Sequence, residues 1–371
     1  MLMLEMATSV SSANSELRGS ALAIILYEVA EQIQIEQMRD RFGGRRVGPR
    51  FKHAAPEYVR FQRPPVVENL EPVSLASGER VDAQIKYYDY GVVSVLFECP
   101  FAGEWDAWIR LASRWMASDE FERQAQQLAR QRLEQHAPGV LVKPYTSWLA
   151  EDYFVFHISE IPASPTAGQL LAECGAQITG IVRGETERLS DAERAEVLHS
   201  RLSYYPQDLV VVGWHGAFLY DTAAGAQTTI ELLEYANSQL LEFRHYDQLL
   251  TTELEGVYQT LDRDKGAIRR WRLARKAARL QTVALDVTEL AERADNAIKF
   301  LSDMFSARLY RLAAAKVGVF DYKNLVHQKL RTADELYRFM IEQFQQARAF
   351  VLELMVVVIL IIELVYLFRG K

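Results

Sequence analysis

Residues 84–97 read QIKYYDYGVVSVLF and predict a β-hairpin. Their two halves, 84–88 and 92–97, are rich in the aromatic and β-branched residues that favour strands. Asp89, Tyr90 and Gly91 lie between these halves and suit a tight turn. The chain is therefore expected to contain at least one antiparallel pair of strands.

The segments on both sides of this hairpin alternate between strand and helix. Upstream, residues 21–29 are apolar except for Glu28 and predict a buried strand, and residues 33–42 predict a short helix. Downstream, residues 104–135 follow helical spacing with three tryptophans on one face. The order strand, helix, hairpin, helix predicts a first α/β unit over residues 20–148.

A similar order then begins again. Residues 153–158 predict a strand, residues 168–182 a helix, and residues 209–212 and 217–220 a second strand pair. This repetition predicts a second α/β unit over residues 149–225. Two ferredoxin-like halves are one way to build such a region.

From residue 227 onward no strand pattern recurs, and the apolar residues repeat in heptads. The pattern predicts a helical coiled-coil region over residues 226–347, so the expected fold class is α+β. Such seams either join copies of the chain into a homo-oligomer or pack within one chain as an antiparallel bundle. The seam residues include Leu233, Ala236, Leu240, Phe243, Leu250, Leu254, Val257, Leu290, Ala297, Leu301, Val326, Leu330, Ala333, Tyr337 and Met340.

The last apolar stretch, residues 349–368, reads AFVLELMVVVILIIELVYLF. About 20 apolar residues are enough for one membrane-spanning helix, so residues 348–371 are predicted to be a transmembrane tail anchor. Residues 1–19 are Ser-rich, make a poor signal peptide and are expected to be disordered. The prediction is a single-pass protein of a bacterial inner membrane or an organellar membrane, with most of the chain cytosolic.

Two acids interrupt this stretch, Glu353 and Glu363. Ten residues at about 100° each place them roughly 80° apart around a helix, so both can face one side. Acids at such depth usually face protein, which predicts an intramembrane contact with a neighbouring helix. The alternative is that a tilted span tolerates both acids near its ends.

Composition restricts the function classes. A net charge of −7 and a pI near 5.7 argue against a protein that coats nucleic acid. Cys99 and Cys174 have no metal-ligand spacing, and no phosphate-binding glycine loop or catalytic serine motif is present. We therefore expect no catalytic residue, cofactor or metal, and the sequence leans against an enzyme. His157 and His215 are either satisfied structural residues or catalytic bases.

A basic run between the first two long helices is the one local charge pattern with a binding interpretation. On a helix, Arg269, Arg272, Lys276 and Arg279 share a face that can meet anionic lipid headgroups or RNA phosphates. The alternative is a solvated connector. Nucleic acid is a partner that the sequence permits and does not favour.

The C-terminal residues resemble the required-for-meiotic-nuclear-division family. Leu352-Glu353, Val356, Leu360-Ile361 and Glu363-Leu364 are similar to that family's apolar run, in which a second glutamate follows ten residues after the first. The resemblance implies an α/β N-terminal part and a helical C-terminal part that ends in one membrane helix. It implies no catalytic residue, and a mitochondrial member is associated with inner-membrane support of organellar translation.

Together these patterns predict a non-enzymatic, tail-anchored membrane scaffold or tether. It would self-associate through its helical region, contact membrane lipid and present its α/β domain to a cytosolic protein partner. One alternative is a membrane-bound enzyme or nucleotide or ligand sensor with a pocket between the α/β halves. Another is an RNA-binding membrane tether.

Overall fold

A computed structural model describes residues 16–41, 64–136, 139–263, 275–276, 278–289, 292 and 304–369, without the side chains of residues 260–263, 343–354 and 366–369. The chain divides into two compact units. The first contains the residues up to 242 together with 294–321, and the second contains residues 243–293 and 322–371. The predicted disordered segment, residues 1–19, lies largely outside the described residues.

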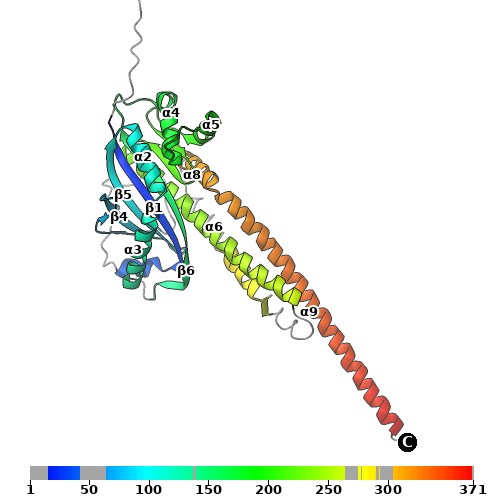
Figure 1. The fold of residues 1–371 in the computed structure, drawn as a ribbon. Coiled ribbons are helices and arrows are strands. Elements are labelled where there is room, and N and C mark those ends of the chain that lie inside the picture. The colour runs from blue at the N-terminus through cyan, green and yellow to red at the C-terminus, as the bar shows by residue number, and fades with distance from the viewer. Residues whose placement is uncertain are drawn as a thin grey trace, which may run out of the picture. The chain divides into compact units, whose positions relative to one another are not determined.

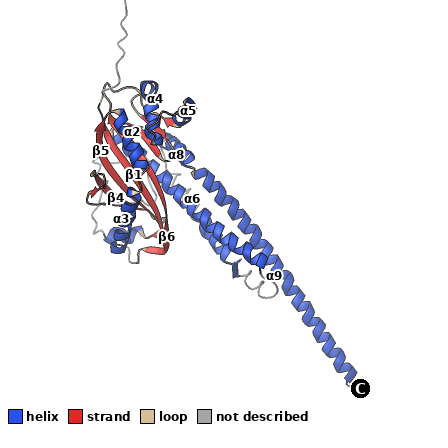
Figure 2. Cartoon of the chain, viewed as in Figure 1, coloured by secondary structure: helices blue, strands red, loops and turns tan. Residues whose placement is uncertain are grey.

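The first unit is built on a nine-stranded mixed sheet with the strand order β2-β4-β5-β1-β6-β9-β8-β7, in which β3 pairs with β4 (Figures 1 and 2). All neighbouring strands are antiparallel except β6 and β9, which are parallel. The strands are β1 (Leu17–Ile33), β2 (Val66–Asn69), β3 (Val73–Ser74), β4 (Arg80–Tyr87), β5 (Val92–Gly103), β6 (Leu141–Glu160), β7 (Arg201–Leu202), β8 (Leu209–Val212) and β9 (Gly216–Tyr220).

The predicted hairpin is confirmed as β4 and β5, which pair antiparallel from Tyr87 and Val93 outward. Gly91 closes the turn with a φ of +96°, a conformation that L side chains rarely adopt. A Cβ at this position would lie 1.8 Å from the carbonyl oxygen of Ala30. Gly91 is therefore required both for the turn and for its close approach to β1.

The prediction of two ferredoxin-like halves is wrong, because both predicted units contribute to one sheet. The strand β6 is 20 residues long and pairs antiparallel with β1 over most of its length. Residues 154–158 of β6 also pair in parallel with β9. The second set of strands thus extends the first sheet instead of closing a second one.

The helices of the first unit are α1 (Ile35–Arg41), α2 (Trp105–Met116), α3 (Glu120–His136), α4 (Ala167–Arg183), α5 (Asp191–His199), the first part of α6 (Ala223–Arg263) and α8 (Met304–Val317). One apolar core joins α2, α3 and α4 to the sheet. It contains alternate residues of β1, including Ala23, Ile25 and Tyr27, and large side chains of the helices such as Trp108 and Phe121. A strand whose alternate residues are buried in this way presents its other side chains to the opposite face.

On the opposite face, α6 packs against the sheet through a line of polar pairs. Lys86 of β4 forms an ion pair with Glu234, and the hydroxyl groups of Tyr90 and Ser238 lie 2.8 Å apart. Glu28 of β1 and Glu242 of α6 are also buried, and each is 1% exposed. Residues 234, 238 and 242 are four apart, so they share one face of the helix. We call these two pairs and the two buried glutamates the polar seam.

The second unit is helical. Its elements are the remainder of α6, helical residues 278–289 and α9 (Val319–Arg369) from residue 322 onward. A small core joins Leu254 and Val257 of α6 to Leu280 and to Ala333 and Met340 of α9. Part of the predicted heptad pattern is therefore buried within one chain, and self-association through these helices stays an untested prediction.

Among the described residues, no helix is both long enough and apolar enough to cross a membrane. Glu363 interrupts the apolar side chains of α9 that the structure describes, residues 355–365. The predictions of a C-terminal transmembrane tail anchor and of a single-pass membrane location are therefore not upheld.

Candidate functional site

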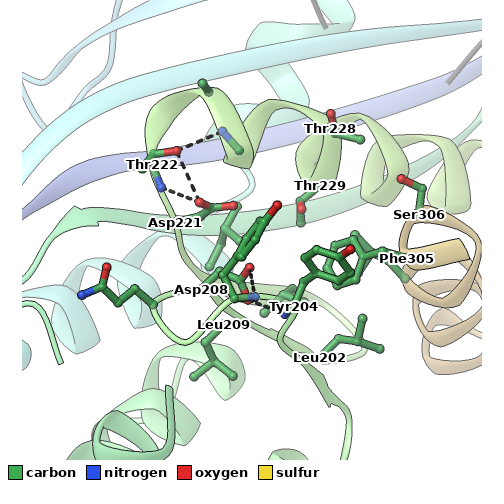
Figure 3. Close-up of a pocket in the computed structure, with 17 residues that line it drawn as sticks. Leu202, Tyr204, Asp208, Leu209, Asp221, Thr222, Thr228, Thr229, Phe305 and Ser306 are labelled. Atoms are coloured by element: carbon green, nitrogen blue, oxygen red, sulfur yellow. Dashed lines mark hydrogen bonds between the residues drawn. The ribbon is translucent and has the colours of Figure 1, made fainter. Parts of the chain in front are cut away.

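A cleft of about 890 Å³ lies in the first unit, between the loop that follows β7, the strands β8 and β9, the start of α6 and the start of α8 (Figure 3). Its size falls in the range of small-molecule sites, which is about 300–1,000 Å³. The lining residues are Leu202, Tyr204, Tyr205, Gln207, Asp208, Leu209, Val210, Leu219, Asp221, Thr222, Ala224, Gly225, Thr228, Thr229, Phe305, Ser306 and Leu309.

One wall of the cleft is the first turn of α6. The Thr222 hydroxyl accepts a hydrogen bond from the Gly225 amide at 3.2 Å, which caps the helix. The Asp221 carboxylate accepts one from the Thr222 amide at 2.6 Å and lies so close to Gly225 that a Cβ there would be 2.3 Å from Asp221 Oδ2. Gly225 therefore makes room for the carboxylate at the positive end of the helix.

A second wall is the loop at residues 203–208, which Asp208 holds in place. Its two carboxylate oxygens accept hydrogen bonds from the backbone amides of Tyr204 and Tyr205, at 2.6 and 2.8 Å. The Ser203 hydroxyl donates to the Tyr205 carbonyl at 2.9 Å. Both carboxylate oxygens of Asp208 are therefore bonded within the loop. These hydrogen bonds fix the backbone that carries Tyr204 and Tyr205.

Three aromatic rings form one side of the cleft. The ring of Tyr204 meets that of Phe305 at a centroid distance of 5.2 Å and that of Tyr205 at 4.8 Å, both edge to face. Figure 3 shows Tyr204 and Phe305 next to each other, at the opposite side from Thr222. The two tyrosines are 62% and 66% exposed, which leaves ring surface available to a ligand.

The interior of the cleft combines apolar and hydroxyl groups. Leu209 and Leu219, on β8 and β9, are 1% and 2% exposed, and they belong to the sheet. Thr229 is 5% exposed and lies on the side of α6 that faces the cleft. A ligand here would meet an apolar base with hydroxyl groups on one side and aromatic rings on the other.

The charge of the cleft is negative. Among the described lining residues, Asp208 and Asp221 are the acids and there is no lysine, arginine or histidine. Burial raises the pKa of Asp221 above its ordinary 3.8, the hydrogen bond from the Thr222 amide opposes this shift, and the charge of Asp208 adds to it. A negative site with no basic residue disfavours phosphate or carboxylate ligands.

The residues predicted from sequence do not line this cleft. Arg269 and Arg272 lie outside the described residues. Lys276 donates to the backbone carbonyl of Gly256, and Arg279 forms an ion pair with Glu253 at 2.7 Å, so both basic groups contact α6 within the second unit. Their predicted role with lipid or RNA stays untested.

The predicted acids belong to α9. The side chain of Glu363 is exposed, whereas that of Glu353 lies outside the described residues. No observation tests their contact with a neighbouring helix. Among the described residues, no group of three or more acidic, histidine or cysteine side chains is placed to hold a metal ion.

The two histidines are separated in the structure. His157 is buried in β6, and its Nε2 lies 2.9 Å from the carbonyl oxygen of Asp221. Burial lowers its pKa below 6.5, and the bond to that carbonyl partly opposes the shift. His215 lies 3.0 Å from Asp152 at the β8–β9 turn. Neither histidine lines the cleft, although His157 fixes the backbone of a residue that does.

Sequence reasoning missed the cleft because its walls come from distant segments. Residues 202–229 and 305–309 meet through the packing of α8 on β8 and of the Phe305 ring on Tyr204. One local signal was present. Asp221 and Thr222 directly precede a long helix, which is a helix N-terminus pattern. Such a pattern indicates a cap and says nothing of the aromatic rings opposite.

Comparison with known proteins identifies the family of this chain. The model of the family described as "Uncharacterized protein MJ0711, N-terminal domain" matches residues 18–227, which is more than half of the chain. The uncharacterized protein MJ0711 of Methanocaldococcus jannaschii is 19% identical over 236 residues, which cover 64% of this chain and 71% of that protein. No solved structure matches the chain.

These matches correct the family prediction. The resemblance to the required-for-meiotic-nuclear-division family rested on residues 352–364, whereas the matching family covers the sheet and the first turn of α6. Two glutamates ten residues apart in an apolar run are a short pattern that arises easily, so the resemblance was wrong. The matched residues include most of the cleft lining, up to Gly225.

Proposed function

From the premise that this chain belongs to the family of the MJ0711 N-terminal domain, we propose that its sheet unit is a binding module for a small organic cation with an apolar, preferably aromatic, body. The observation that carries this proposal is the composition of the cleft, in which a carboxylate and aromatic rings face one volume without a basic residue among the described lining.

The acidic lining of the cleft favours a ligand of positive charge. Asp221 offers a carboxylate that can accept more than its two hydrogen bonds from the Thr222 amide and hydroxyl, because each carboxylate has about four acceptor positions. A hydrogen bond to a charged group is worth about 1.5–3 kcal/mol. An ammonium group at Asp221 would gain this energy, and an anionic group in the same place would be repelled.

The aromatic rings select the shape of the ligand. A cation over an aromatic face gains about 0.5–1 kcal/mol at an exposed site, and a flat apolar body gains more by covering ring surface. Tyr204 and Phe305 provide this surface, and their edge-to-face packing restricts how far the Tyr204 ring can move. The cleft therefore suits a ligand whose ring and amine are joined by a short spacer.

The proposal is tested with two probes that share one ring and differ in charge, tryptamine and indole-3-propionate. Saturation-transfer NMR on the full-length protein should detect tryptamine and show weak or no transfer to the acid. Asp221→Asn should weaken tryptamine binding by about tenfold or more, from the energy of one charged hydrogen bond. The matched control is Asp191→Asn, an exposed acid at the start of α5.

A second pair of variants tests the contribution of the aromatic rings to binding. Tyr204→Ala should weaken tryptamine binding by about two- to fivefold, whereas Tyr258→Ala, at an exposed tyrosine of the second unit, should not. Equal binding of both probes, or tryptamine binding that Asp221→Asn leaves unchanged, would contradict the proposal. The predicted scaffold role through the helical region stays a separate, untested prediction.

A further inference from the structure

We propose that His157 of β6 is a positioning residue for the cleft, which acts through one peptide group to fix the direction of the Asp221 carboxylate. This role rests on the proposed function of the cleft, in which Asp221 receives the ammonium group of the ligand. His157 does not line the cleft, so it acts on Asp221 and not on the ligand itself.

His157 and the Asp221 carboxylate contact opposite ends of one peptide group, the one between Asp221 and Thr222. Its carbonyl oxygen lies 2.9 Å from Nε2 of His157, and its N–H donates to the Asp221 carboxylate at 2.6 Å. A peptide group is planar and almost always trans, so its C=O and N–H point in opposite directions. A donor that holds the carbonyl oxygen therefore also sets the direction of the N–H.

The strands β6 and β9 place the imidazole ring next to this peptide group. Their parallel register pairs His157 with Leu219 and Ile158 with Tyr220, the last residue of β9. Phe156 and Ile158 belong to the apolar core on the side of α2, α3 and α4. Because side chains alternate along a strand, the ring of His157 lies on the opposite face, beside the residue that follows β9.

The partner atom decides which nitrogen of the ring carries a hydrogen. A carbonyl oxygen only accepts hydrogen bonds, so Nε2 of His157 must be a donor. Burial lowers the pKa of His157 below 6.5, and the bond to the Asp221 carbonyl partly opposes this shift, so the ring is neutral at pH 7 with its hydrogen on Nε2. A neutral donor fixes the peptide group without adding a positive charge that would compete with a cationic ligand.

Two further contacts restrict the Asp221 carboxylate. The Asp221 amide donates to the Ile158 carbonyl oxygen at 3.4 Å, so β6 holds both the N–H and the C=O of this residue. On the other side, a Cβ at Gly225 would lie 2.3 Å and 2.5 Å from the two carboxylate oxygens. Rotation of the 221–222 peptide group would therefore deprive the carboxylate of its bond from the Thr222 amide, the contact that His157 preserves.

Removal of the His157 donor should change the pKa of Asp221. Burial is the largest cause that raises this pKa, the Thr222 amide opposes the rise, and the charge of Asp208 adds to it. A peptide group that is free to rotate weakens the bond from the Thr222 amide, so the pKa of Asp221 should rise further. The described lining of the cleft contains no lysine, arginine or histidine that would offset this change.

Three variants of the full-length protein test this role. His157→Leu removes the donor, and His157→Gln restores one, because the Gln amide nitrogen donates as well. Tyr153→Phe is the matched control, since Tyr153 is also a buried residue of β6 and donates to a backbone carbonyl, that of Gly213, at 3.1 Å. NMR of ¹³C-labelled aspartate side chains, with Asp221→Asn to identify the signal, measures the pKa of Asp221 without any ligand.

His157→Leu should raise the pKa of Asp221 and weaken tryptamine binding at pH 7 by about threefold to tenfold, from the partial loss of one charged hydrogen bond. His157→Gln should keep both quantities close to wild type. Tyr153→Phe should change neither, although it too removes a buried hydrogen bond. A histidine that only stabilises the fold would lower the unfolding temperature without moving the pKa of Asp221.

Three outcomes would overturn the proposal. The first needs no variant and is a ¹⁵N NMR spectrum of the wild-type protein that places the His157 hydrogen on Nδ1. The second is a folded His157→Leu protein with the wild-type pKa of Asp221, and the third is an equal rise of that pKa in Tyr153→Phe. A protein that shows the expected pKa changes but binds no tryptamine would support the positioning role and contradict the proposed function of the cleft.

Discussion

Replacing Glu234 by leucine should be among the most destabilising single changes on the α6 face. Its partner Lys86 is nearly inaccessible, since the two side chains are 9% and 0% exposed. Burial opposes the charge of Lys86, but Glu234 and the nearby Glu231 outweigh it and raise the pKa of Lys86 above 10.5. Without Glu234, the lysine must either stay charged in a dry site or lose its proton.

The cost of deprotonating Lys86 gives an estimate of the free energy of unfolding that this variant loses. Each pKa unit is worth about 1.4 kcal/mol, so deprotonating a lysine of ordinary pKa 10.5 at pH 7 costs roughly 5 kcal/mol. Breaking one partner of a buried pair typically costs about 3–5 kcal/mol. We therefore expect Glu234→Leu to lose about 3–5 kcal/mol at pH 7, a large share of the 5–15 kcal/mol that stabilises most folded proteins.

Urea unfolding followed by circular dichroism measures this loss, and two further variants identify its cause. The double variant Lys86→Met/Glu234→Leu should return to within about 1–2 kcal/mol of wild type, because no buried charge is left. Glu193→Leu, which breaks a partly exposed ion pair with Arg183, should change stability by less than about 1 kcal/mol. The loss in Glu234→Leu should shrink as the pH rises toward 10.5. A double variant as unstable as the single one would refute the reasoning.

Three other changes have clear expected outcomes. Gly19→Ala should unfold or strongly destabilise the protein in thermal unfolding, because its Cβ would lie 1.9 Å from the His157 carbonyl oxygen. The control is Gly168→Ala in α4, where the space around the Cβ is open, and its free energy of unfolding should stay the same or rise by up to about 1 kcal/mol. Trp108→Ala should cost about 3–5 kcal/mol by urea unfolding, because the ring is fully buried. Tryptamine affinity should increase as the pH rises through the raised pKa of Asp221, and calorimetric titrations from pH 4 to pH 7 that show no increase would argue against an ionised Asp221 as its partner.

The sequence predicted a strand or helix correctly where the apolar residues followed a clear period. The strand at residues 21–29 is the centre of β1, and the helix at 168–182 is α4 with a capping box between Thr166 and Gln169. The long helix at 104–135 is broken, because residues 117–119 separate α2 from α3. Ser118 Oγ accepts a hydrogen bond from the Glu120 amide there, which starts a new helix.

The sequence did not predict how these elements are arranged in space. Pro144 disfavours a strand over residues 141–148, yet Leu141, Val142 and Pro144 pair with the end of β1 beyond an irregularity in the register at residues 28–30. The long partner strand supplies the hydrogen bonds that the local sequence does not specify. The same limit hid the cleft, whose aromatic wall forms only when Phe305 of α8 reaches the 203–208 loop.

The central claim, that the cleft binds a small organic cation, is tested most directly by a crystal structure of the full-length protein with tryptamine. We predict its ammonium group within about 3 Å of an Asp221 carboxylate oxygen and its indole ring against Tyr204 and Phe305. Tryptamine bound with its ammonium group away from Asp221, or bound only elsewhere on the protein, would contradict the claim.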